Sequence, residues 1–242
     1  MDKEKLNQEL LKTNNLNRAK ELIEKGADVN ARDKYGQTPL IIACGRQSKH
    51  ANIELIKYLI EKGANVNATG EDEYHDQTPI MMAIRADYLI RSVAMQIIDI
   101  LLKAGADINA ATKSDKITAL TKASRLGHLS ITKFLVEHGA NLNAQDSDGW
   151  TPLMYAINSG RFDVVRYLVE NGADINYKNK FGWTAIDLSN DLAYDNINKY
   201  GENNKVGIGY LNMANYLSNK LKKQYDTQID NSFVQSFDEL SL

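Results

Sequence analysis

The chain has 242 residues, of which 25% are charged, and a formal net charge of −2. This near-neutral balance argues against a nucleic-acid-binding protein that depends on bulk electrostatic attraction. The single cysteine, Cys44, excludes an intramolecular disulfide, and no apolar run approaches the roughly 18 residues that a membrane-spanning helix needs.

The first predicted element is a helix over residues 3–13, which places Leu6, Leu10 and Leu11 on one side and charged residues elsewhere. A helix with a polar outer face is typical of the terminal cap of a repeat protein, because the outermost unit meets water. These residues also lack the apolar stretch of a secretory signal. We therefore expect a cytoplasmic protein, or one that is exported without a cleaved signal peptide.

A short phrase, L-I-E-K-G-A-D-V-N-A, occupies residues 22–31 and returns with small changes along the chain. Its further copies lie at 59–68, 101–110, 135–144 and 168–177. A second phrase, G-Q-T-P-L in its first copy, marks the same units at 36–40, 76–80, 116–120, 149–153 and 182–186. The threonines Thr118, Thr151 and Thr184 follow one another at intervals of 33 residues. Self-similarity at this period indicates a solenoid.

Residues 145–177 show how one unit is expected to fold. Gly149 permits a turn, and Thr151 offers a hydroxyl that can cap the first helix. Apolar residues then recur at helical spacing over 163–170, which predicts a second helix. Gly172 supplies the left-handed residue that ends this helix, and an extended segment leads to the next turn.

Insertions interrupt this unit at 48–52, 69–76 and 87–93. In the last unit, residues 194–208 are polar and predict a loop, which precedes a second helix over 211–222. After Lys223 the chain becomes acidic, with Phe233, Val234, Phe237 and Leu240 interspersed. Residues 224–242 are expected to form either a disordered tail or a short helix or strand that docks on the repeats or on a partner.

The T-P-L-x-x-A phrases at 38–43 and 151–156, the 33-residue period and the G-A-D-x-N-A closures resemble the ankyrin repeat family. The resemblance covers about residues 16–223. It implies an all-α solenoid of about six stacked helix–turn–helix repeats with projecting β-hairpin tips. The implied ankyrin domain spans 1–223 and divides into an N-terminal cap at 1–32, repeats near 33–68, 69–110, 111–144 and 145–177, and a C-terminal cap at 178–223 with an insertion near 194–208.

The histidine that usually follows T-P-L in this family is missing from every unit. Its positions hold Ile41, Met81, Thr121, Met154 and Asp187. Catalytic motifs are missing as well: the histidines form no H-x-x-x-H pair, and the chain contains no phosphate-binding loop or nucleophile elbow. The acidic tip at 71–76 lacks the spacing of a calcium loop. We expect a non-enzymatic protein without a metal or a cofactor.

The resemblance implies that the tips and first helices line one concave face, where a protein partner binds. By motif position, the candidate partner-binding residues are Lys34, Tyr35, Arg46, Tyr74, His75, Arg85, Asp115, Ile117, Arg125, Trp150, Asn158, Phe181 and Trp183. Aromatic residues and arginine are enriched at interface hot spots, which favours a partner segment with acidic and apolar groups. The alternative is that the tryptophans pack between neighbouring tips and the arginines form internal ion pairs.

We expect a monomeric interaction scaffold that binds protein and no nucleic acid, and other functions stay open beside it. The tail could occupy the face and inhibit it, or the protein could be a secreted or host-targeted bacterial effector or adaptor. The resemblance also implies that some asparagines fit the target phrase of an asparaginyl hydroxylase of animal cells. These are Asn30, Asn67, Asn109, Asn143 and Asn176.

Overall fold

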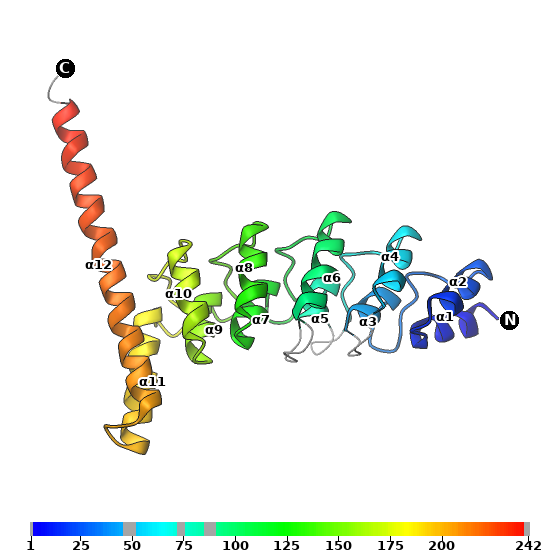
Figure 1. The fold of residues 1–242 in the computed structure, drawn as a ribbon, viewed down its shortest axis with the longest axis horizontal. Coiled ribbons are helices and arrows are strands. Elements are labelled where there is room, and N and C mark those ends of the chain that lie inside the picture. The colour runs from blue at the N-terminus through cyan, green and yellow to red at the C-terminus, as the bar shows by residue number, and fades with distance from the viewer. Residues whose placement is uncertain (1, 46–51, 72–75, 85–90, 240–242) are drawn as a thin grey trace.

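The computed structural model describes residues 2–45, 52–71, 76–84 and 91–239, and these residues form twelve helices that stack along one axis (Figure 1). The helices are α1 Lys3–Lys12, α2 Leu16–Glu24, α3 Pro39–Gly45, α4 Ile53–Glu61, α5 Pro79–Ala83, α6 Arg91–Lys103, α7 Ala119–Leu126, α8 Leu129–Glu137, α9 Pro152–Asn158, α10 Phe162–Glu170, α11 Ala185–Tyr200 and α12 Lys205–Glu239.

The helices form two layers. Each odd-numbered helix packs against its even-numbered successor in the chain, and odd helices also pack against odd helices from α1 to α11. The even helices pack on one another from α2 to α10 in the same way. This arrangement confirms the expected all-α solenoid of stacked helix pairs.

Threonine caps begin the first helices as the sequence predicts. The Thr151 hydroxyl accepts a hydrogen bond from the backbone N–H of Met154 at 3.3 Å, and Pro152 is the first residue of α9. Thr118 caps α7 in the same way through the N–H of Thr121 at 3.2 Å. Such caps satisfy backbone donors that the helix itself leaves without partners.

The core is a continuous strip between the two layers. Its most regular members are the leucines that open each copy of the repeat phrase, with an equivalent leucine in α12, and all are at most 1% exposed. They are Leu22, Leu59, Leu101, Leu135, Leu168 and Leu217. Because each leucine contacts only its own and adjacent units, the core lengthens with every repeat and does not thicken.

The expected loop over residues 194–208 is wrong. Helix α11 continues to Tyr200, and only 201–204 separate it from α12. The capping box of Thr184 and Asp187 starts α11, and Ala193 is buried along it. Gly207 lets α12 approach closely, because a Cβ there would lie 2.7 Å from Cγ1 of Ile197. Packing of the α11 face that carries Ala193 and Ile197 against α12 therefore outweighs the low helix propensity of the Asn and Asp residues.

Helix α12 is longer than the expected 211–222. It begins at Lys205, continues through the acidic segment to Glu239, and extends away from the stacked repeats in Figure 1 (orange to red). Among the described residues no strand is assigned, and the single isolated bridge joins Ala111 and Thr118. The β-hairpin tips and the division of the chain at 1–223 and 224–242 therefore stay predictions.

The expected insertions lie partly outside the described residues. Residues 48–51, 72–75 and 87–90 belong to that part of the chain. At the described ends of these segments, Asn52 caps α4 by accepting a hydrogen bond from the N–H of Leu55 at 3.0 Å. Residues 91–93 belong to α6, so the expected helix link over 87–93 is shorter by these residues.

Candidate protein-binding face

The turns that precede the first helices are here called tips, and in three of them one side chain organises the backbone. Oδ1 of Asp33 accepts hydrogen bonds from the backbone N–H groups of Tyr35 at 2.8 Å and Gln37 at 2.9 Å. Oδ1 of Asp146 accepts from Asp148 and Trp150, both at 2.8 Å. These bonds fix the backbone from which the candidate aromatic side chains project.

The last tip has an asparagine in the organising position. Oδ1 of Asn179 accepts from the N–H groups of Phe181 and Trp183, both at 3.0 Å. In the preceding unit, the second carboxylate oxygen of Asp146 accepts a hydrogen bond from the Tyr155 hydroxyl at 2.6 Å. The position equivalent to Tyr155 in the last unit holds Leu188, which has no hydroxyl. The amide nitrogen of Asn179 is accordingly buried without an acceptor.

Neighbouring tips are joined by backbone hydrogen bonds. The Glu71 N–H donates to the Tyr35 carbonyl at 3.0 Å, and the Ser147 N–H donates to the Asp115 carbonyl at 2.8 Å. The Lys180 N–H donates to the Asp148 carbonyl at 2.9 Å. These links hold successive tips in a fixed row, so side chains on different repeats keep constant separations.

The asparagines of the repeat phrase connect the units at a second place. Nδ2 of Asn67 donates to the Gly105 carbonyl at 3.2 Å, while its Oδ1 accepts from the Asp107 N–H at 2.8 Å. Asn30 and Asn109 bridge to their following units in the same two ways. These asparagines therefore have a structural role between repeats.

Arg125, Trp150 and Tyr155 come together in the middle of the tip row. The Arg125 guanidinium lies 6.0 Å from the centroid of the Tyr155 ring, within the range of a cation–π contact. The Trp150 and Tyr155 rings have centroids 5.5 Å apart and are tilted by 51°. Two candidates from the sequence, Arg125 and Trp150, thus both contact Tyr155. We call these three residues the central cluster.

Sequence reasoning missed Tyr155. The sequence feature that could have identified it is its place in the first turn of α9, just after the position where the family has histidine. Burial and the hydrogen bond to Asp146 raise the pKa of the Tyr155 phenol, so it stays a donor over the whole physiological range. Its hydroxyl is engaged by Asp146, and its ring is the part that offers apolar surface.

The two tryptophans differ in burial. Trp150 is half-buried against Tyr155, whereas Trp183 is 39% exposed and the adjacent Phe181 is 67% exposed. The alternative in which the ring packs to stiffen the tip therefore describes Trp150 better than Trp183. The C-terminal end of the row presents the larger aromatic surface.

The N-terminal end of the row contains a groove of about 310 Å³ between α1, the first tip and α3. Its lining includes Leu11, Lys12, Asp33, Lys34, Tyr35 and Ile42. The Lys34 ammonium lies 4.7 Å from the Tyr35 ring centroid, and Tyr35 is 37% exposed. The structure thus places both N-terminal sequence candidates in one concave feature.

The other candidates are dispersed. Asp115 is exposed on its tip, Ile117 is half-buried, and Asn158 is exposed at the last residue of α9. Four candidates lie outside the described residues: Arg46, Tyr74, His75 and Arg85. Of the three candidate arginines, Arg125 is the one that the structure describes. Its side chain contacts Tyr155 and forms no ion pair with another described residue.

The described residues contain no group of three or more His, Cys, Asp or Glu side chains that could hold a metal ion. Burial raises the pKa of the Cys44 thiol, which disfavours the thiolate that a nucleophile needs. No helix in the described part of the chain is both long and apolar enough to cross a membrane.

Stacked helix pairs joined by hydrogen-bonded tips define an α-helical repeat solenoid. A sequence model of ankyrin repeats in three copies matches residues 9–112 and again 89–179, which together exceed half of the chain. The chain therefore belongs to the ankyrin repeat family. A search of curated proteins returned no match.

Proposed function

We propose that this protein is a non-enzymatic interaction module that binds a protein partner along its tips and first helices. Ankyrin repeats are generally protein–protein interaction modules. The observation that carries the proposal is the row of aromatic and cationic groups on successive units. It runs from Lys34 and Tyr35 through the central cluster to Phe181 and Trp183.

The composition of this row suits a protein surface. Aromatic residues and arginine contribute large contact areas at little cost in conformational entropy and dominate measured hot spots. The tips carry charges of both signs, as in the exposed pair of Lys180 and Asp148 at 3.7 Å. A polyanion would favour a face of one sign, so a protein segment with mixed groups fits this row better.

The rigidity of the row supports the same proposal. Backbone bonds between tips and the asparagine bridges between units fix the row before a partner arrives. A pre-organised surface loses little freedom on association, so more of the contact energy remains as affinity. Autoinhibition by the C-terminal segment is the competing proposal, and it requires α12 to break and fold back onto the tips.

The test is affinity capture from the native host with quantitative mass spectrometry. The full-length protein is compared with a variant that carries Arg125→Ala, Phe181→Ala and Trp183→Ala, since these side chains are exposed and hold no cap or core position. We expect specific partners to fall at least about tenfold, the loss of roughly 1.4 kcal/mol or more that hot-spot truncation causes.

The matched control is Lys133→Ala on α8, an exposed residue of the second-helix layer. It should capture the same partners as the unchanged protein. Equal capture by the triple variant, with unchanged circular dichroism, would contradict binding along the tips.

A further inference from the structure

The groove at the N-terminal end of the row has an apolar lining. Leu11 of α1 is buried, Ile42 of α3 is half-buried, and the Tyr35 ring closes one side. Its volume of about 310 Å³ is at the small end for a binding site. It can hold one or two large side chains, which is the scale of an anchor residue in a peptide.

The charges at this groove are unequal. Lys12 and Lys34 bring two ammonium groups, against the single carboxylate of Asp33. That carboxylate already accepts two backbone N–H groups of its own tip, which partly compensates its charge. The groove therefore favours an anion beside an apolar group.

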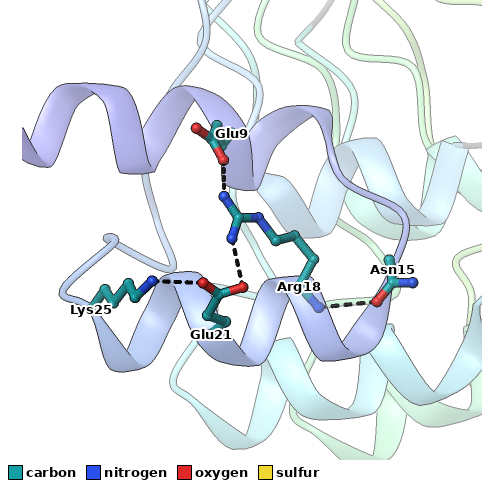
Figure 2. A network of polar contacts seen from close by, with 5 residues as sticks. All are labelled: Glu9, Asn15, Arg18, Glu21 and Lys25. Carbon is teal, nitrogen blue, oxygen red and sulfur yellow. Dashed lines mark hydrogen bonds and ion pairs between the residues drawn. The ribbon is translucent and has the colours of Figure 1, made fainter. Parts of the chain in front are cut away.

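The walls of the groove are held in place by contacts outside it. Figure 2 shows Arg18 of α2 between Glu9 of α1 and Glu21, with Lys25 donating to Glu21 at 2.6 Å. Oδ1 of Asn7 on α1 also accepts the Asp28 N–H at 2.8 Å. The first tip is tied to the next by the bond from Glu71 to Tyr35. These contacts hold the backbone of the groove walls in place before binding.

We propose that this groove is the anchor site for an acidic segment of a protein partner, with one large apolar side chain inserted beside a carboxylate. The apolar side chain lies against Leu11, Ile42 and the Tyr35 ring, and the carboxylate pairs with Lys34 and Lys12. This inference rests on the proposed function and deepens it by giving the partner's chemistry and the place where it binds first. Desolvating the apolar side chain gives affinity, and the ammonium groups select an acidic sequence.

The test is selection of a displayed library of random 12-residue peptides on five full-length proteins: the unchanged chain, Lys34→Glu, Tyr35→Ala, Arg125→Ala and the control Lys57→Glu. Lys57 is the matched control, because it is an exposed lysine on α4, in the second-helix layer, whose ion pair among the described residues is with Glu54, one turn away. All five proteins should give the same helical circular dichroism.

We expect peptides selected on the unchanged chain and on Lys57→Glu to be enriched in Leu, Ile or Phe next to Asp or Glu. On Lys34→Glu the acidic preference should be lost, and the affinity of the selected peptides should fall about tenfold or more. Tyr35→Ala should weaken the same peptides while keeping the acidic preference of those that still bind.

Three outcomes would overturn the groove proposal: no enriched acidic–apolar motif, the same motif on Lys34→Glu, or a motif lost only in Arg125→Ala. In the last case a peptide binds the central cluster, so the proposed function would survive while the anchor site would not. Failure of the proposed function looks different, because the groove peptides would bind while captured host partners ignore the tip variants.

Discussion

Tyr155 links the central cluster to the framework beneath it. Its hydroxyl donates to Asp146, the residue that organises the tip carrying Trp150, while its ring contacts both Trp150 and Arg125. One side chain therefore couples the shape of a tip to the surface that a partner would meet. At the scale of single residues, the shape of the proposed binding face depends on such contacts as well as on exposure.

Replacing Tyr155 with Phe should lower the free energy of unfolding by about 1 kcal/mol, because it removes one hydrogen bond to a carboxylate and keeps the ring. Urea denaturation with an unchanged m-value is the measurement. Tyr167→Phe on α10 is the control: Lys133 lies over its ring, and its hydroxyl makes no hydrogen bond with the residues that the structure describes. Equal stability of the two variants would show that the Asp146 contact contributes nothing.

Glu21 supplies a pH-dependent contribution at the same scale. Hydrogen bonds from Lys25 and then Arg18 lower the pKa of its carboxyl from 4.5 to about 2. A carboxylate whose pKa is lower in the folded state stabilises the fold above pH 4.5, and this contribution is lost as the pH falls toward 2.

The measurement is the pH titration of the Glu21 carboxyl carbon shift by NMR. Lys25→Met should raise the midpoint toward the ordinary value, and Arg18→Met should do so to a smaller extent, because Lys25 is the larger cause. A midpoint near 4.5 in the unchanged protein would rule out the network drawn in Figure 2.

At the scale of elements, the tips are packed too closely for most side chains. Gly149 has φ of +79°, and a Cβ there would lie 3.0 Å from Cα of Asn179 on the next tip. Gly172 closes α10 with φ of +95° but has open space around the same position. The two positions require glycine for different reasons. Position 172 requires only the left-handed backbone conformation, whereas position 149 also requires the absence of a side chain.

Gly172→Ala should therefore cost about 1–2 kcal/mol, the strain of a left-handed alanine. Gly149→Ala should cost at least about 1 kcal/mol more, because the neighbouring backbone must move as well. Thermal and urea unfolding of the two variants give the comparison. If Gly149→Ala is no worse than Gly172→Ala, the tips are not packed as closely as the structure has them.

At the scale of the whole molecule, the main packing contacts of each helix pair, among the residues that the structure describes, are with the pairs beside it. Stability in such a solenoid is a sum of unit terms and nearest-neighbour terms. A cavity in the first unit should therefore loosen that unit and its neighbour while the far end keeps its protection. The long α12 completes the last pair by packing against α11, and its C-terminal part extends away from the stacked repeats (Figure 1).

Leu22→Ala and Leu168→Ala test this locality, since both leucines are fully buried at equivalent positions. Each should cost about 2–5 kcal/mol. Hydrogen exchange should accelerate on the order of 30-fold or more in α1–α4 for the first variant and in α7–α12 for the second. Uniform acceleration over the whole chain in both variants would show a single cooperative unit.

The repeated helix-pair architecture could be predicted from the sequence because its contacts are local and recur in every unit. The Thr caps, the closing glycines and the buried leucines each depend on residues a few positions apart, so the 33-residue pattern predicts them in every unit. The family and the helix-pair solenoid follow from that pattern. Register also assigned Lys34, Tyr35, Arg125 and Trp150 as candidates for the binding face, because the tips and first helices keep one position in each unit, and this assignment stays a prediction.

Tertiary structure alone decided the features that break the pattern. Residues 194–200 include one Asp and two Asn and predict a loop, yet they continue α11, which packs against α12 through the half-buried Ile197 beside Gly207. Tyr155 joined the central cluster through a contact with Asp146 nine residues away, and the groove arose where α1, a tip and α3 meet. Such sites depend on how separate elements pack, and a repeat pattern carries no information on the side chains that fill the space between them.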